Sequence, residues 1–240
     1  MEIHKPKLFH NWREFLKEYG IIVLGVLTAL LAEQAVQSIE WRHKVDAAIA
    51  DMGNELSTAD GPEAYARLAA HDCIATRLDA IRAVVESGDR AQSGKLIDSF
   101  WLPKRTWDSL AREAATASDV ASHMPHQRML EYRIAYEVVP DMQRIADKEL
   151  ADLGHLRALP RSGGAIETAE KLQEIDAIEA LQLDNDAIAR EARFTLAHVE
   201  TLNLNLNPVF VRRDMLEAST NLGNCLSTPR IPAAPPVGVD

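Results

Sequence analysis

The longest apolar stretch of the chain lies near its N-terminus. The run from Gly20 to Ala32 carries no charge, and Glu18 and Glu33 flank it. As a helix, these thirteen residues cover roughly 20 Å, which is less than the hydrocarbon core of about 30 Å. Taken alone, the run therefore fits a buried core helix or the apolar segment of a signal peptide as well as a membrane span.

The flanking residues lengthen this run into a candidate membrane span. Apolar side chains continue on both sides of it, at Phe15, Leu16, Tyr19, Ala35, Val36 and Ile39. A helix from Trp12 to Trp41 measures about 43 Å, close to a bilayer with its headgroups. Because Trp and Tyr favour the membrane interfaces, we predict a transmembrane helix over residues 12–41 with three interface anchors, Trp12, Tyr19 and Trp41.

Two alternatives to a span differ in strength. A cleaved signal needs small residues at positions −3 and −1, but cutting after Ala32 or Ala35 places Leu30 or Glu33 at −3. The signal peptide is therefore disfavoured. A core helix of a cytosolic protein stays open, because the charge of Glu33 lies close to the run.

Basic residues beside the span predict its orientation. Four precede its uncharged run and two follow it: Lys5, Lys7, Arg13, Lys17, Arg42 and Lys44. The positive-inside rule then predicts that residues 1–11 are cytoplasmic and that the body is exported. Asn11 is a suitable N-cap for the helix, with Glu14 at the third helical position.

Two patterns within this helix indicate packing surfaces. Gly25 and Ala29 form a small-xxx-small pair, which is a candidate helix-dimer contact within the span. Beyond the span, apolar residues recur at heptad-like spacing at Val45, Ile49, Met52 and Leu56. This stripe predicts a continuing helix that packs on the rest of its own chain or on a second copy.

The remaining pattern predicts one helical bundle over residues 42–225, and we expect an all-α fold. Asp60-Gly61-Pro62 should break the chain before a helix that ends near Glu86, and a loop with Gly88 and Gly94 should follow. Later helices are expected at 106–117, 125–158 and 165–201, separated by breaks at 122–125 and 160–164. Pro140 should kink or interrupt the second of them.

The last part of the chain is less regular. The segment LNLNLNP at 202–208 alternates as a strand does, but Asn is a poor strand former, so we favour a fraying helix end. The tail at 226–240 is rich in Pro and is predicted to be disordered.

Charge changes the picture of possible partners. The chain has 240 residues and a net charge of −10, of which residues 1–44 contribute +1 (six basic, five acidic) and the rest −11 (twenty basic, thirty-one acidic). An acidic body repels phosphate backbones, so we expect no nucleic-acid partner.

The N-terminal stretch contains WREFL, IIVLGVLTAL, and EQ followed by a Trp-Arg pair. In these features it resembles an uncharacterised family of bacterial, single-pass, membrane-anchored helical proteins. The likeness continues through HDCIATRLDAI, SDVASHMPHQRMLEYRIAY and NCLSTPRIP. The resemblance implies anchoring in a proteobacterial inner membrane. It implies no particular activity, because the family has none assigned.

The chain has two cysteines, Cys73 and Cys225. Export to an oxidising compartment would allow them to pair, and closing a loop of about 150 residues stabilises a fold by about 5 kcal/mol in the chain-entropy model. The alternative is two buried, reduced thiols. We favour the disulfide because the body is predicted to be exported.

Candidate chemistry is sparse. His123 and His126 form an HxxH pair, but a metal site needs further ligands, and His71 or His155 could supply one only if the fold brings it close. His71, Asp72 and Cys73 are adjacent, and neighbouring residues on a helix diverge by about 100°, so a Cys nucleophile is disfavoured. We therefore expect no catalytic residue, metal or cofactor.

Other polar groups have structural interpretations. Trp101 and Trp107 flank Lys104 and Arg105, and core aromatics are favoured there over an anion or carbohydrate platform. Four acidic residues are expected to be solvent-facing: Glu113, Asp119, Glu131 and Glu137.

Two functional hypotheses remain for a protein that we do not expect to be an enzyme. The first is an anchored periplasmic interaction or scaffold protein, whose partners are the lipid bilayer, a second copy and an envelope protein. The alternative is a ligand-sensing bundle that signals through a separate membrane partner, because about a dozen cytoplasmic residues are too few for an output domain.

Overall fold

The computed structural model describes residues 12–103, 106–158 and 165–229. Every regular element in these ranges is a helix, which confirms the predicted all-α fold. The chain divides into two compact units, Met1–Ala47 and Ala48–Asp240. The second unit is the helical body, and it begins six residues later than the predicted boundary at residue 42.

The described part of the first unit belongs to helix α1 (Trp12–Glu55). Its large apolar side chains are exposed, including Ile21, Ile22, Leu24, Leu27, Leu31 and Val36. Among the described residues, one continuous helix, Phe15–Ser87, has the length and apolar composition to cross a membrane. Its apolar stretch of 18 residues is 0% buried. Core helices and signal sequences can meet the same criterion. The predicted Asn11 cap, with the Glu14 side chain, lies outside the described residues.

The predicted break at Asp60-Gly61-Pro62 is wrong, because the helix continues through it. A single π-helical turn, η1 (Leu56–Asp60), joins α1 to α2 (Gly61–Ser87). In this wider turn the Gly61 N–H donates to the Leu56 carbonyl, five residues earlier. Pro62 lacks an N–H and crowds the preceding turn of a regular helix. The π-turn places Pro62 in the first turn of α2, where proline is tolerated.

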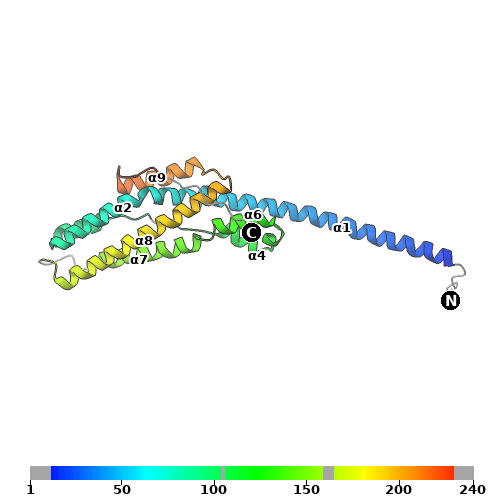
Figure 1. The fold of residues 1–240 in the computed structure, drawn as a ribbon, viewed down its shortest axis with the longest axis horizontal. Coiled ribbons are helices and arrows are strands. Elements are labelled where there is room, and N and C mark those ends of the chain that lie inside the picture. Colours follow the sequence, from blue (N-terminus) through cyan, green and yellow to red (C-terminus); the bar gives the residue numbers. More distant parts are fainter. Residues whose placement is uncertain (1–11, 104–105, 159–164, 230–240) are drawn as a thin grey trace, which may run out of the picture. The chain divides into compact units, whose positions relative to one another are not determined.

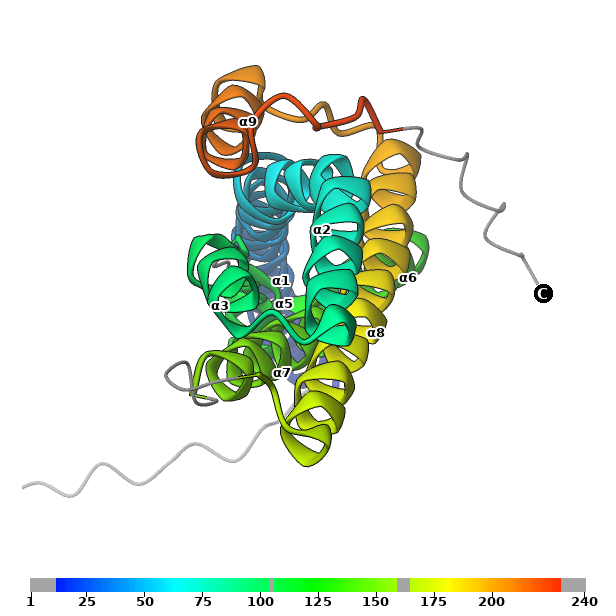
Figure 2. The same cartoon turned by 90° about the vertical axis from the view of Figure 1, so that its left-hand side faces the viewer.

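Four longer helices form the body (Figure 1; Figure 2). Helix α2 packs against α8 (Thr168–Thr201), α8 packs against α7 (Val139–Ala158), and α9 (Pro208–Leu222) lies along α2. The central core is aliphatic with one phenylalanine: Ile74, Leu78, Ile81, Ile97, Phe100, Leu156, Ile178 and Leu181. Met52 and Leu56 are buried in the body, so this part of the heptad-like stripe packs on its own chain.

Two of the connections differ from their predicted form. The loop expected around Gly94 is helix α3 (Arg90–Ser99), and the Asp89 side chain caps it by accepting from the Gln92 N–H at 3.0 Å. Helix α4 (Leu110–Ala117) starts later than residue 106. The backbone N–H groups of Trp107 and Asp108 donate instead to side chains, those of Gln143 and Asp60.

The helix predicted over 125–158 is interrupted, as Pro140 implied. A short helix α5 (Val120–His123) precedes α6 (His126–Ala135), and α7 then begins with Pro140 in its first turn. Helix α8 agrees with the predicted 165–201 apart from its first residues. The turn predicted at 160–164 lies outside the described residues.

The segment at 202–208 is neither a strand nor a fraying helix end. Helix α8 stops at Thr201, and Asn203 adopts a left-handed φ of 55°. An additional helix, α9, then begins at Pro208, and the Asn207 side chain caps it by accepting from the Val209 N–H at 3.0 Å. An Asn cap followed by Pro is a helix-start signal that was present in the sequence but overlooked. Residues 230–240 of the predicted tail lie outside the described residues.

Candidate functional site

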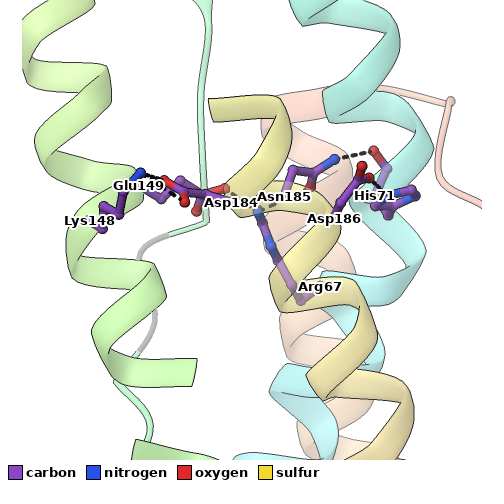
Figure 3. A network of polar contacts seen from close by, with 7 residues as sticks. All are labelled: Arg67, His71, Lys148, Glu149, Asp184, Asn185 and Asp186. Atoms are coloured by element: carbon purple, nitrogen blue, oxygen red, sulfur yellow. Dashed lines mark hydrogen bonds and ion pairs between the residues drawn. The ribbon is translucent and has the colours of Figure 1, made fainter. Parts of the chain in front are cut away.

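A buried polar network joins three helices of the body (Figure 3). Arg67 on α2, Glu149 on α7 and Asn185 on α8 are each no more than 2% exposed. The Arg67 guanidinium forms an ion pair with Glu149 and also donates to the Asn185 side-chain oxygen at 3.1 Å. The Asn185 amide donates in turn to the His71 carbonyl at 3.1 Å. These bonds set how α2, α7 and α8 align.

The electrostatics of this network fit a structural role. Burial raises the pKa of Glu149, and the neighbouring Arg67 acts in the opposite direction. Taking both charges out of water costs several kcal/mol, which their attraction offsets only in a well-bonded geometry. The Arg67 Nε and Nη1 atoms are buried without a hydrogen-bond partner among the described residues, so the geometry is incomplete.

Further charged and polar groups lie at both ends of the network (Figure 3). The Lys148 ammonium lies 2.9 Å from Asp184, which links α7 to α8. It also lies 2.8 Å from Asp152 on its own helix. At the other end, the His71 ring nitrogens each lie 2.8 Å from a carboxylate, one from Asp72 and one from Asp186. These groups are paired with one another, and they hold helices together rather than surround a reactive atom.

A second group of buried acids lies at the π-turn. Asp60 is 0% exposed, and its Oδ1 accepts from the Asp108 N–H at 3.3 Å. Burial raises the pKa of Asp60 to about 8, and the nearby charges of Glu55, Glu63 and Asp108 act in the same direction. The Glu55 carboxylate accepts from the Ala111 N–H at 2.9 Å, in the first turn of α4. The acids therefore connect the π-turn to α4 and the segment before it.

Neither group of buried polar residues was predicted from the sequence. Arg67, Glu149 and Asn185 have no distinctive local pattern, because each looks like an ordinary polar position on a helix, and Asp60 was assigned to a predicted chain break. Their common property is burial, which depends on partners more than eighty residues away in the case of Arg67 and Glu149.

A cavity of about 250 Å³ lies within the body, between the end of α1 and helices α4 to α6. Three methionines, a tyrosine and two alanines are among its lining residues, and two arginines supply charge. Its lining residues are Met52, Arg112, Ala115, Thr116, Ala121, Met124, Met129, Tyr132 and Arg133. The methionines are scattered along the sequence, so no spacing rule could have identified this pocket.

The histidines singled out by the sequence do not form a metal centre. His123, His126 and His155 are exposed, and the His71 ring nitrogens contact the carboxylates of Asp72 and Asp186. Across residues 12–103, 106–158 and 165–229, no cluster of three or more His, Cys, Asp or Glu side chains could hold a metal ion.

Cys73 and Cys225 form a disulfide, as predicted. The bond joins α2 to the segment that follows α9. Two further contacts support the same junction: Arg77 donates to the Leu222 carbonyl at 2.9 Å, and the Ser227 N–H donates to the Ala69 carbonyl at 3.1 Å. In this oxidised state Cys73 has no thiolate, so the His71-Asp72-Cys73 sequence is not a nucleophile with its base.

The remaining predicted groups take structural positions. Trp107 is buried and Trp101 packs against the core, whereas Lys104 and Arg105 lie outside the described residues. Of the four acidic residues expected at the surface, three are exposed, and the fourth, Glu131, is half-buried and pairs with Arg128 at 3.2 Å.

The predicted anchors lie along α1. Trp12 is exposed and stacks on Phe15 with ring centroids 5.7 Å apart, and Phe15 stacks in turn on Tyr19 at 6.1 Å. The Lys44 ammonium lies 4.8 Å from the Trp41 ring centre. Gly25 and Ala29 are exposed, and a Cβ added at Gly25 would meet nothing within 4 Å.

The described residues therefore define a class: an all-α body, tied by one disulfide, that follows a long apolar N-terminal helix. No protein-family model, curated protein or solved structure matches the chain.

Proposed function

We propose that the chain is a single-pass membrane protein whose helical body acts by binding other proteins. Helix 12–41 spans the bacterial inner membrane, residues 1–11 are cytoplasmic and the body is periplasmic. One observation carries the proposal: the apolar stretch of 18 residues in this helix is 0% buried. A continuous apolar surface of this kind is unfavourable in water at about 25 cal/mol per Å² and favourable in lipid.

Export of the body rests on two separate observations. The Cys73–Cys225 disulfide is of a kind that persists in oxidising compartments such as the bacterial periplasm. Four basic residues precede the uncharged run Gly20–Ala32 of the span and two follow it, which favours a cytoplasmic N-terminus. Neither observation depends on the other.

A binding role for the body follows from how its polar groups are used. The buried pair Arg67–Glu149 and the pair between the exposed Lys148 and the buried Asp184 each join two helices, and so stabilise the bundle. We therefore assign the body a scaffold role, with a second copy and an envelope protein as partners.

The membrane placement is tested with the full chain and C-terminal reporters. We expect alkaline phosphatase to be active, a fluorescent protein that folds only in the cytosol to stay dark, and the chain to resist extraction by alkaline carbonate. Replacing both Leu24 and Leu27 by Arg should release it, because each arginine at the centre of a span costs about 2.5–3.5 kcal/mol. The same change at Leu172 and Leu183, which are exposed on the body, is the control. A fluorescent, carbonate-soluble chain would refute the placement.

Self-association through the span has its own test. Gly25→Ile should reduce dimer crosslinking in membranes, because it removes the close approach that Gly25 and Ala29 allow. Gly20→Ile is the matched control, since a Cβ at either glycine would meet nothing within 4 Å in the chain itself. Equal crosslinking of both variants would exclude this contact.

The protein partner is tested by crosslinking in intact cells, followed by mass spectrometry of the recovered complexes. We expect a reproducible envelope protein linked to body residues. Recovery of self-contacts alone would contradict the proposed envelope partner.

A further inference from the structure

The methionine-lined pocket is built like a binding site for an apolar group. Four lining residues are at most 8% exposed, namely Met52, Ala115, Met124 and Tyr132. They come from separate segments: the end of α1, helix α4, the residue after α5 and helix α6. Methionine is flexible and polarizable, which lets such a surface adapt to an unbranched alkyl chain.

The size of the cavity limits what it can hold. A dry cavity of about 150 Å³ accommodates one benzene ring, and sites for drug-sized ligands start near 300 Å³. At about 250 Å³, this pocket suits one alkyl chain of moderate length. It is too small for a lipid with two chains.

Two arginines give the pocket a charge preference. Arg112 on α4 and Arg133 on α6 both line it. Neither makes an ion pair with a carboxylate in the described part of the chain. The Arg112 Nε is buried without a hydrogen-bond partner among the same residues, and its guanidinium lies 6.0 Å from the Tyr136 ring centre. A buried donor without an acceptor is unfavourable, and an anion in the pocket would satisfy it.

We propose that this pocket binds a single-chain amphiphile with an anionic head, of the medium-chain carboxylate type. The alkyl chain lies among Met52, Met124 and Met129, and the carboxylate accepts hydrogen bonds from Arg112 and Arg133. This site goes beyond anchoring and scaffolding. It lies wholly within the body, so it does not depend on how α1 meets the membrane.

The test uses the full chain in phosphatidylcholine nanodiscs and a decanoate that carries a diazirine on its alkyl chain. After illumination, mass spectrometry identifies the labelled peptides. We expect saturable labelling at Met124 and Met129, displaced by decanoate at a concentration about tenfold or more below that needed for decanol, which lacks the charge. Labelling of residues 12–41 reports partition into the bilayer and is scored separately.

Variants assign the binding to this pocket. Thr116→Trp should block the labelling, because Thr116 is an exposed lining residue where a larger side chain occupies the pocket without disturbing the core. Arg112→Gln should weaken binding about tenfold or more. If Arg112→Gln does not fold, Arg133→Gln decides the same question, because Arg133 is at an exposed position. Arg128→Gln is the matched control on α6, outside the pocket, and should bind as the wild type does.

Three results would overturn the proposal. The first is labelling of the body that does not saturate. The second is labelling that persists unchanged in Thr116→Trp. The third is equal competition by decanol and decanoate, which would leave an apolar cavity without anion selectivity. A pocket that instead receives an apolar side chain of a partner protein would give the first result.

Discussion

Arg67 and Glu149 place opposite charges inside an otherwise apolar bundle, each only 2% exposed. Such a pair contributes little net stability compared with apolar residues of the same size, because both charges lose their hydration. Removing one partner is a different matter, since the other is then buried alone. Asn185 and the His71 carbonyl extend the bonding, so the pair is part of a directional network that selects one alignment of α2, α7 and α8.

The first prediction concerns this pair. Arg67→Met should lower the free energy of unfolding by about 3–5 kcal/mol, because Glu149 stays buried without its cation. Adding Glu149→Leu should recover most of the loss. Arg144→Met is the control: its partner is Asp141, both side chains are exposed, and the expected change is below about 0.5 kcal/mol. Thermal unfolding followed by circular dichroism measures all three, and a similar loss for Arg67→Met and Arg144→Met would refute the argument.

The second prediction is a pH dependence set by Asp60. Its pKa rises from 3.8 to about 8 on folding because burial disfavours the charged form. Between these values the folded state holds a proton that the unfolded state has released, so this group makes stability fall as pH rises from about 4 to about 8. Asp60→Asn should flatten this part of the profile and stabilise the protein at pH 8. The amide oxygen can still accept from the Asp108 N–H.

The control for this profile is Asp141→Asn, because Asp141 is an exposed acid on α7. Its profile should follow that of the wild type. An unchanged slope between pH 4 and pH 8 in Asp60→Asn would show that other groups determine the pH dependence.

At the scale of single elements, the π-turn explains why Gly61 is needed. Its φ is an ordinary helical −64°, so conformational freedom is not the reason. The reason is space: a Cβ there would lie 2.4 Å from both the Leu56 carbonyl oxygen and a methyl group of Leu206. The turn brings the Leu56 carbonyl inward to bond the Gly61 N–H, and the backbone cannot easily withdraw.

The third prediction follows from this close approach. Gly61→Ala should destabilise the protein by about 1–3 kcal/mol, as overpacked sites do. Gly154→Ala in α7 is the matched control, because a Cβ there meets nothing within 4 Å. It should stabilise by about 0.5–1 kcal/mol through helix propensity. Thermal unfolding of both variants gives the comparison, and equal signs would contradict it.

At the scale of the whole molecule, the disulfide determines how the end of the chain is held. Cys73 lies on α2 and Cys225 follows α9, at a sequence separation of 152. Besides the bond, α9 is held by its packing along α2. A cross-link between positions so distant removes many conformations from the unfolded chain. In the chain-entropy model this stabilises the folded state by about 5 kcal/mol.

The fourth prediction tests this cross-link. Reduction, or replacement of both cysteines by serine, should lower the free energy of unfolding by about 2–5 kcal/mol. On non-reducing gels the native chain should migrate faster than the reduced chain, because the closed loop keeps the denatured chain compact. Identical migration with and without reductant would mean that the bond is not formed in the protein as isolated.

The features that sequence analysis predicted correctly are those with local causes. Pro140 interrupts the helix at 125–158 because proline lacks an N–H donor, whatever surrounds it. Breaks at Gly and Pro residues marked the ends of most of the predicted helices of the body. The disulfide was a non-local success, but two cysteines allow only one intramolecular pairing, so only the oxidation state was in question. By contrast, Pro62 did not break the chain, because a neighbouring π-turn accommodated it.

The sequence by itself determined the helical class, the apolar N-terminal helix and the acidic charge of the body, because each depends on composition or on spacing within a few turns. Only the tertiary structure decided which polar groups are buried and which side chains share a cavity. Arg67 meets Glu149 and Asn185 across 82 and 118 residues of sequence, and Met52 shares a pocket with Met124 and Met129. Such juxtapositions depend on how whole helices pack, and no local pattern along the chain encodes them.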